Sequence, residues 1–271
     1  MTAGVEATLR RQRTLTIAAL ALLTLLAWAW LLLGAGMEMA PRADLHLFPT
    51  PPAHSMADMA GMAMPIAPTP WTAAQLLLAV SMWWVMMVAM MLPAAAPVIL
   101  LYARAGAAQG AAPAAPGWFL AGYLAVWGLF SFAAALMQDG QQRLGVLAPM
   151  TMDASAEWLA AAILIAAGLY QLSPLKEACL VRCRNPAAFL SRHYRPGRRG
   201  ALRMGAIHGA FCLGCCWLLM ALLFVGGVMN LAWIALLTLL VAAEKLLPGG
   251  RRVGLAAGLG FIVWGALVAF L

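Results

Sequence analysis

The chain has 271 residues, of which 65% are hydrophobic and only 10% are charged. A water-soluble domain of this length carries far more charge, so this composition excludes one and predicts a protein whose apolar surface is covered by lipid. The net charge of +8 could suggest a nucleic-acid partner, but the basic residues flank apolar stretches, where membrane topology explains them. We therefore predict an all-α, polytopic transmembrane helical bundle whose partner is the lipid bilayer and not nucleic acid.

Seven mostly apolar stretches are each interpreted as a membrane-spanning helix. About 20 residues, at ~1.5 Å per residue, are enough to cross a hydrocarbon layer of ~30 Å. The first stretch is longer than the apolar core of a typical signal peptide, which favours a helix that is retained. The stretches cover residues 15–36, 71–101, 118–138, 157–172, 204–227, 230–247 and 254–271.

The basic residues predict the orientation, because short cytoplasmic loops carry an excess of Lys and Arg. Arg10, Arg11 and Arg13 precede the first helix, and placing this end in the cytoplasm puts the basic loop 173–203 on the same side. An odd number of spans then puts the C-terminus outside. We expect three parts: an N-terminal tail with the first helix (1–36), an external loop rich in Met and Pro (37–70), and a six-helix membrane domain (71–271).

The external loop carries closely spaced methionines that can act as soft metal ligands. Flanking proline-rich sequence favours an extended chain. Thioethers select Cu(I) over hard cations, and imidazole binds copper in either oxidation state. The loop is therefore either a site that captures copper or a low-complexity tether without a specific role. The candidate ligands are His54, Met56, Met59, Met62 and Met64.

The helix predicted over residues 71–101 presents a stripe of methionines. At about 100° per residue, Met82, Met86 and Met90 share one face. Pro93 and Pro97 continue this face, and they free backbone carbonyls that need a protein or water environment. We expect the face to point into the bundle. Methionine is also an ordinary core residue, so both packing and metal binding stay open for these thioethers.

The basic inner loop contains two cysteines. Cys179 and Cys183 are four residues apart, so their thiols lie on one side if the fourth helix continues past Pro174 or restarts there. Both are candidate metal ligands. They are equally well explained as reduced cytosolic cysteines beside an anionic lipid surface.

The helix predicted over residues 204–227 carries four reactive side chains within an arc of roughly 100°, so that all can face one partner. They are His208, Cys212, Cys215 and Cys216. One buried cysteine would be explained by packing, but three with a histidine favour a metal or redox site. Met90 and Cys215 lie equally far from the cytoplasmic ends of their predicted helices, so the two stripes could meet near mid-membrane.

The sixth predicted helix follows the fifth after a tight turn and is bounded by polar residues. Asn230 is expected to cap its start. Glu244 and Lys245 end it at the cytoplasmic face, where a pair with Lys176 or simple solvation is favoured over a proton relay.

Three separated motifs carry a resemblance. They are Trp83-x-x-Met86-x-x-x-Met90-Met91-x-Pro93, Ser173-Pro174-Leu175-Lys176-x-x-Cys179-x-x-x-Cys183, and His208-Gly-x-x-Cys212-x-Gly214-Cys215-Cys216-Trp217. Together they resemble a bacterial family, a domain of unknown function, described as predicted metal-binding integral membrane proteins. The resemblance covers about residues 75–265. It implies an inner-membrane helical bundle with a link to metal and no settled activity, and it makes the five cysteines and His208 the residues most expected to matter.

The leading hypothesis is a membrane protein that handles Cu(I) by transport, storage or delivery to a partner metalloenzyme or membrane complex. Soft ligands favour copper, although Cys and His alone would suit zinc equally well. One alternative is a membrane thiol–disulfide oxidoreductase that uses Cys212 and Cys215, and another is a non-catalytic subunit of a larger complex. An enzyme is disfavoured, because the sequence offers no cysteine outside to which electrons could pass.

Overall fold

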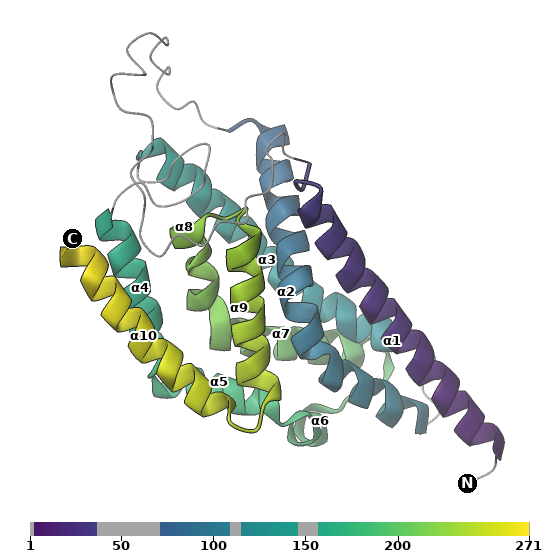
Figure 1. The fold of residues 1–271 in the computed structure, drawn as a ribbon. Helices are drawn as coiled ribbons and strands as arrows, with labels where there is room; N and C mark the ends of the chain where they lie inside the picture. The colour runs from purple at the N-terminus through teal and green to yellow at the C-terminus, as the bar shows by residue number, and fades with distance from the viewer. Residues whose placement is uncertain (1–2, 37–70, 109–114, 146–156, 271) are drawn as a thin grey trace.

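The computed structural model describes residues 3–36, 71–108, 115–145 and 157–270, and within these ranges every regular element is a helix (Figure 1). The all-α prediction is confirmed. The external loop with His54, Met56, Met59, Met62 and Met64 lies outside the described residues. The elements are α1 (Ala3–Leu32), α2 (Ala73–Ala108), α3 (Ala115–Arg143), α4 (Glu157–Gln171), α5 (Pro174–Arg184), α6 (Pro186–His193), α7 (Gly197–Ala221), α8 (Leu223–Gly226), α9 (Leu231–Leu246) and α10 (Gly250–Phe270).

Each of the seven predicted helices has its counterpart, but several boundaries differ. α1 begins at Ala3 instead of residue 15, and α7 at Gly197 instead of residue 204. The basic residues at these starts have good helix propensity, so the helices continue beyond their apolar stretches. α1 ends at Leu32 because Gly34 and Gly36 take positive φ angles of 84° and 74°.

Five of the described helices are long and apolar enough to cross a membrane. They include most of α1, α2, α3 and α10, and α7 together with α8. α4 and α5, bent by 63° relative to each other, make a sixth candidate if they are taken as one span. α9 matches the helix predicted over 230–247, but its 16 residues are fewer than the ~20 that cross a bilayer.

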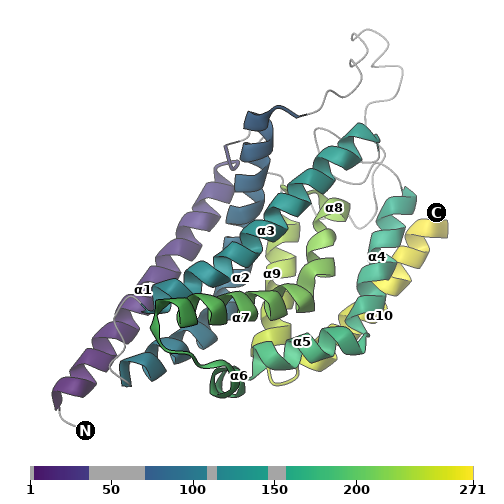
Figure 2. The same cartoon turned by 180° about the vertical axis from the view of Figure 1, so that it is seen from behind.

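The break between α4 and α5 follows from the local sequence. Ser173 caps α5, and its hydroxyl accepts a hydrogen bond from the Lys176 backbone N–H at 3.2 Å. Pro174 occupies the first turn of α5, where its missing N–H costs nothing. The helix therefore restarts at Pro174. α5 then turns across the end of the bundle near which α6 and the N-terminus lie (Figures 1 and 2).

The turn between α8 and α9 is as tight as the sequence predicts. Gly227 has a φ angle of 92°, which a side chain would disfavour. Asn230 caps α9, because its side-chain oxygen accepts hydrogen bonds from the N–H groups of Ala232 and Trp233 at 3.1 and 3.4 Å. This cap confirms the structural role predicted for Asn230.

The bundle has α3 packed on α7 and α4 packed on α10, with α1, α2 and α3 as consecutive neighbours (Figures 1 and 2). α9 lies between these groups and contacts α2, α7 and α10. Glycines allow the α3–α7 approach, because a Cβ at Gly122 would collide with the Leu202 carbonyl and a Cβ at Gly205 with the Phe119 carbonyl. This contact fixes α7, the helix that carries three of the cysteines, against α3.

Replacing Gly122 by Ala is expected to destabilise the bundle, because the new methyl group would collide with the backbone of α7. Overpacking of this kind costs roughly 1–3 kcal/mol. Gly140→Ala, on the same helix but with open space around it, is the matched control and should be neutral or slightly stabilising. Thermal unfolding in detergent, followed by circular dichroism, measures both. Equal Tm values for the two variants would contradict the close α3–α7 contact.

Candidate metal centre

α7 carries its three cysteines on a face that points into the bundle. Cys212, Cys215 and Cys216 are only 2%, 1% and 1% exposed. The thiols of Cys215 and Cys216 donate hydrogen bonds to the Cys212 carbonyl at 3.0 and 2.9 Å. The stripe predicted from the helical spacing therefore lies inside the protein.

α5 brings a fourth thiol to the same place. Cys183 is buried, and its thiol lies within hydrogen-bonding reach of those of Cys212 and Cys215. Cys179 lies one turn earlier, half buried against Gly214, whose missing side chain gives its sulphur room. We call the four buried thiols the thiol cluster; its members are Cys183, Cys212, Cys215 and Cys216.

α2 adds a thioether to the thiol cluster. The Sδ atom of Met91 lies 3.8 Å from the Sγ atom of Cys216. The Tyr123 hydroxyl on α3 joins the same group, because it donates to the Met91 carbonyl at 3.2 Å and lies 3.1 Å from Cys212 Sγ. The methionine stripe of α2 and the cysteine stripe of α7 do meet. The contact joins Met91 and Cys216, each of which follows directly after a residue of the pair compared in the sequence, Met90 and Cys215.

The predicted methionine ligands of α2 lie between the start of this helix and Met91. Met82, Met86 and Met90 are buried, which confirms that their face points inward. Along the helix, Met82 lies about 14 Å from Met91 at ~1.5 Å per residue. Pro97 lies on the same face by helical spacing but is exposed, because none of the described helices covers this position on α2.

His208 precedes Cys212 by one turn and is buried among aromatic rings. Its ring stacks on Tyr123, with centroids 5.8 Å apart, and also packs against Phe119 and Phe189. Its Nδ1 atom is buried and has no hydrogen-bond partner among the described residues. Because an unpaired buried nitrogen is costly, this atom is a candidate donor to a ligand.

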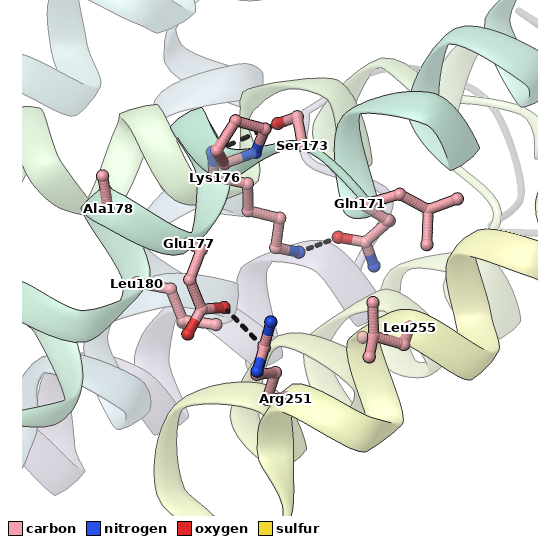
Figure 3. Close-up of a pocket in the computed structure, with 11 residues that line it drawn as sticks. Gln171, Ser173, Lys176, Glu177, Ala178, Leu180, Arg251 and Leu255 are labelled. Atoms are coloured by element: carbon pink, nitrogen blue, oxygen red, sulfur yellow. Dashed lines mark hydrogen bonds and ion pairs between the residues drawn. The ribbon is translucent and has the colours of Figure 1, made fainter.

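A buried ionic network ties α4, α5 and α9 together beside the thiol cluster. The Lys176 ammonium pairs with the Glu244 carboxylate at 2.6 Å, and Gln171 donates to the other carboxylate oxygen at 2.6 Å. Lys176 also donates to Gln171, and both line a cavity of about 440 Å³ together with the ion pair of Glu177 and Arg251 (Figure 3). The predicted pairing of Glu244 with Lys176 is confirmed.

Lys245 differs from its neighbour, because adjacent helical residues point about 100° apart. Its ammonium donates to Cys212 Sγ at 2.9 Å, and the residue is only 7% exposed. The predicted alternative of simple solvation at the cytoplasmic face is therefore wrong for Lys245. The side chain is buried because α5 packs against α9 at this end of the bundle. Neither Met91 nor Lys245 is among the ligands predicted from the sequence. A charge within an apolar stretch was the signal that could have indicated Lys245.

The donors near the thiol cluster are soft sulphur ligands. Among the described residues, no group of three or more His, Cys, Asp and Glu side chains is already arranged to hold a metal ion. What converges is a set of buried thiols, with the Met91 thioether beside Cys216. Thiol and thioether sulphur select Cu(I), whereas structural zinc requires a tetrahedron of four ligands.

Thiol labelling should separate Cys179 from the thiol cluster. In the folded, detergent-solubilised protein, N-ethylmaleimide is expected to modify Cys179 quickly, because it is the one half-buried cysteine, and to reach the other four only after denaturation. Mass spectrometry of the labelled peptides measures this order, and Cys179→Ser should abolish the fast reaction. Fast labelling of a cysteine on α7 would contradict the burial described above.

Comparison with known proteins connects this arrangement to copper. A family model described as copper chaperone, PpoB2, matches residues 80–268, whereas no curated protein and no solved structure matches the chain. The matched segment is well over half of the chain and contains the thiol cluster, Met91, His208 and Lys245. It supports the metal link that the resemblance implied, with copper as the metal. The chain therefore belongs to the PpoB2 family of copper chaperones.

Proposed function

We propose that this protein is a membrane-embedded chaperone that binds Cu(I) in the thiol cluster and delivers it to a partner metalloenzyme. The observation that carries the proposal is the convergence of four buried thiols from α5 and α7 beside the Met91 thioether. Soft sulphur donors are the ligands that select Cu(I). Membership in a copper chaperone family supports copper as the cargo.

Cu(I) binds between α2 and α7, with Cys216, Met91 and Cys212 as its nearest donors. Cys216 and Met91 already face each other, and Cys212 lies one turn away on the same face as Cys216. Cys183 and Cys215 lie beside this group and can replace a ligand as the ion moves. The unpaired Nδ1 atom of His208 supplies a further donor one turn before Cys212.

Copper reaches and leaves the thiol cluster along a row of sulphur atoms. Met82, Met86 and Met90 are spaced one helical turn apart, about 6 Å each, between the start of α2 and Met91. The external loop, with its candidate ligands His54, Met56, Met59, Met62 and Met64, directly precedes that start. At the other side of the cluster, half-buried Cys179 is the first thiol that a partner could approach. These two ends are where copper is exchanged.

The proposed setting is the bacterial inner membrane, with the N-terminus in the cytoplasm. Five helices have the length and apolar composition of membrane spans, which supports a multi-pass protein. α5 and α6, which carry much of the basic inner loop, lie near the N-terminal end of the bundle, while the C-terminus lies at the far end (Figure 1). The excess of basic residues on cytoplasmic loops then assigns the α5 end to the cytoplasm.

The test is metal analysis of protein purified in detergent after growth with copper and zinc. Wild type should carry nearly stoichiometric copper, and Cys212→Ser/Cys215→Ser/Cys216→Ser should lose it. Met91→Leu should weaken Cu(I) binding roughly tenfold, about 1.4 kcal/mol, in competition with a chromophoric Cu(I) chelator. Met204→Leu is the matched control, because this buried methionine instead accepts a hydrogen bond from the Arg195 backbone at 3.2 Å.

Metal-free wild type would refute the copper proposal. A disulfide between Cys212 and Cys215, found by thiol trapping in the metal-free protein, would then support the thiol–disulfide oxidoreductase instead. Stoichiometric zinc without copper would support the same metal site, with zinc and not copper as the bound metal.

A further inference from the structure

Lys245 places an ammonium group inside the bundle, in contact with a proposed copper ligand. The residue is 7% exposed, and its Nζ atom lies 2.9 Å from Cys212 Sγ. A buried ammonium is costly unless a negative group lies beside it. The partner that the structure gives Lys245 is a sulphur atom, not a carboxylate.

The nearby carboxylates are already engaged by other cations. Glu244 pairs with Lys176 at 2.6 Å and accepts a second hydrogen bond from Gln171. Glu177 faces Arg251 at 3.7 Å on the wall of the neighbouring cavity (Figure 3). Within the described residues, the positive charge of Lys245 is therefore directed at the thiol cluster.

Copper binding by two cysteines creates the negative charge that Lys245 is placed to balance. Each thiol that becomes a ligand releases its proton to solvent, and copper stays Cu(I) throughout, so no electron is transferred. One Cu⁺ ion with two thiolates has a net charge of −1, which is costly to bury in an apolar bundle unless it is paired. An ammonium beside one of these thiolates makes the whole site neutral.

We infer that Lys245 is the counter-cation of the copper site, which neutralises Cu(I) bound by two thiolates of the thiol cluster. This inference rests on the proposed function and extends it, because Lys245 acts on copper through Cys212 and is not itself a ligand. Lys176 and Glu244 hold α4, α5 and α9 together, which leaves Lys245 free for this electrostatic role.

The experiment compares Lys245→Met with Lys245→Arg by anaerobic competition for Cu(I) against a chromophoric chelator. Lys245→Met should weaken Cu(I) binding at least tenfold, and Lys245→Arg should keep most of the affinity because it keeps the charge. The matched control is Arg251→Met, which removes an exposed cation that pairs with Glu177 at the same end of the bundle, and it should leave the affinity unchanged.

A second readout separates an electrostatic role from a structural one. Replacing a buried charge by an apolar side chain of similar length should leave the Tm of the metal-free Lys245→Met protein unchanged or raise it. A lower Tm together with weaker copper binding would overturn the inference in favour of a structural role. Equal Cu(I) affinity in Lys245→Met and wild type would also overturn it, while the proposed function stands. Only a wild type that binds no Cu(I) would refute both.

Discussion

An unpaired charge is costly in the interior of an apolar bundle, and this constraint organises the end of the molecule that α5 crosses. Lys176, Glu244 and Gln171 pair with one another, and together they join α9 to α4 and α5, whose paired residues lie 68 and 73 positions earlier in the sequence. An isolated charge at this depth would cost several kcal/mol, so the network forms only when α4, α5 and α9 are all in place. The buried pair thereby makes the position of α5 depend on that of α9.

The position of α5 in turn completes the thiol cluster. α7 alone supplies three thiols on one face, which is a row and not an enclosed site. The 63° bend at Ser173 and Pro174 carries α5 across the end of the bundle, where Cys183 meets Cys212 and Cys215. Gly214 lets Cys179 approach, and the Tyr170 hydroxyl donates to the Gly214 carbonyl, which fixes α4 to the same part of α7. Small and capping residues thus decide how closely the sulphur atoms gather.

A chaperone must bind copper firmly enough to carry it and loosely enough to release it. Under the proposed function, a cluster of more thiols than one Cu(I) ion needs, continued by methionines on one side and Cys179 on the other, would meet both demands, because ligands could be exchanged one at a time. His208 and Tyr123 are buried and stack on each other at this place. Under the proposed function, these surroundings would make the charge of the copper-loaded site matter, since charge interactions are strong in a medium of low dielectric constant.

The sequence by itself determined the features that depend on local geometry. Composition indicated an all-α membrane protein, and helical spacing placed Cys212, Cys215 and Cys216 on one buried face, because side-chain direction in a helix depends only on residue number. Local rules also predicted the cap at Asn230. The pairing of Glu244 with Lys176 was one of two alternatives that the sequence left open, beside simple solvation, and the structure decides for the pair.

Only the tertiary structure decided which side chains face one another across helices. The rotation of α2 about its axis is set by its packing on α1, α3 and α9, so the choice of Met91 over Met90 could not be read from spacing. The burial of Lys245 likewise depends on the packing of α5 and α9, which local sequence patterns do not encode. The family match connects the chain to copper, but the contact between Lys245 and Cys212 exists only once the helices are assembled.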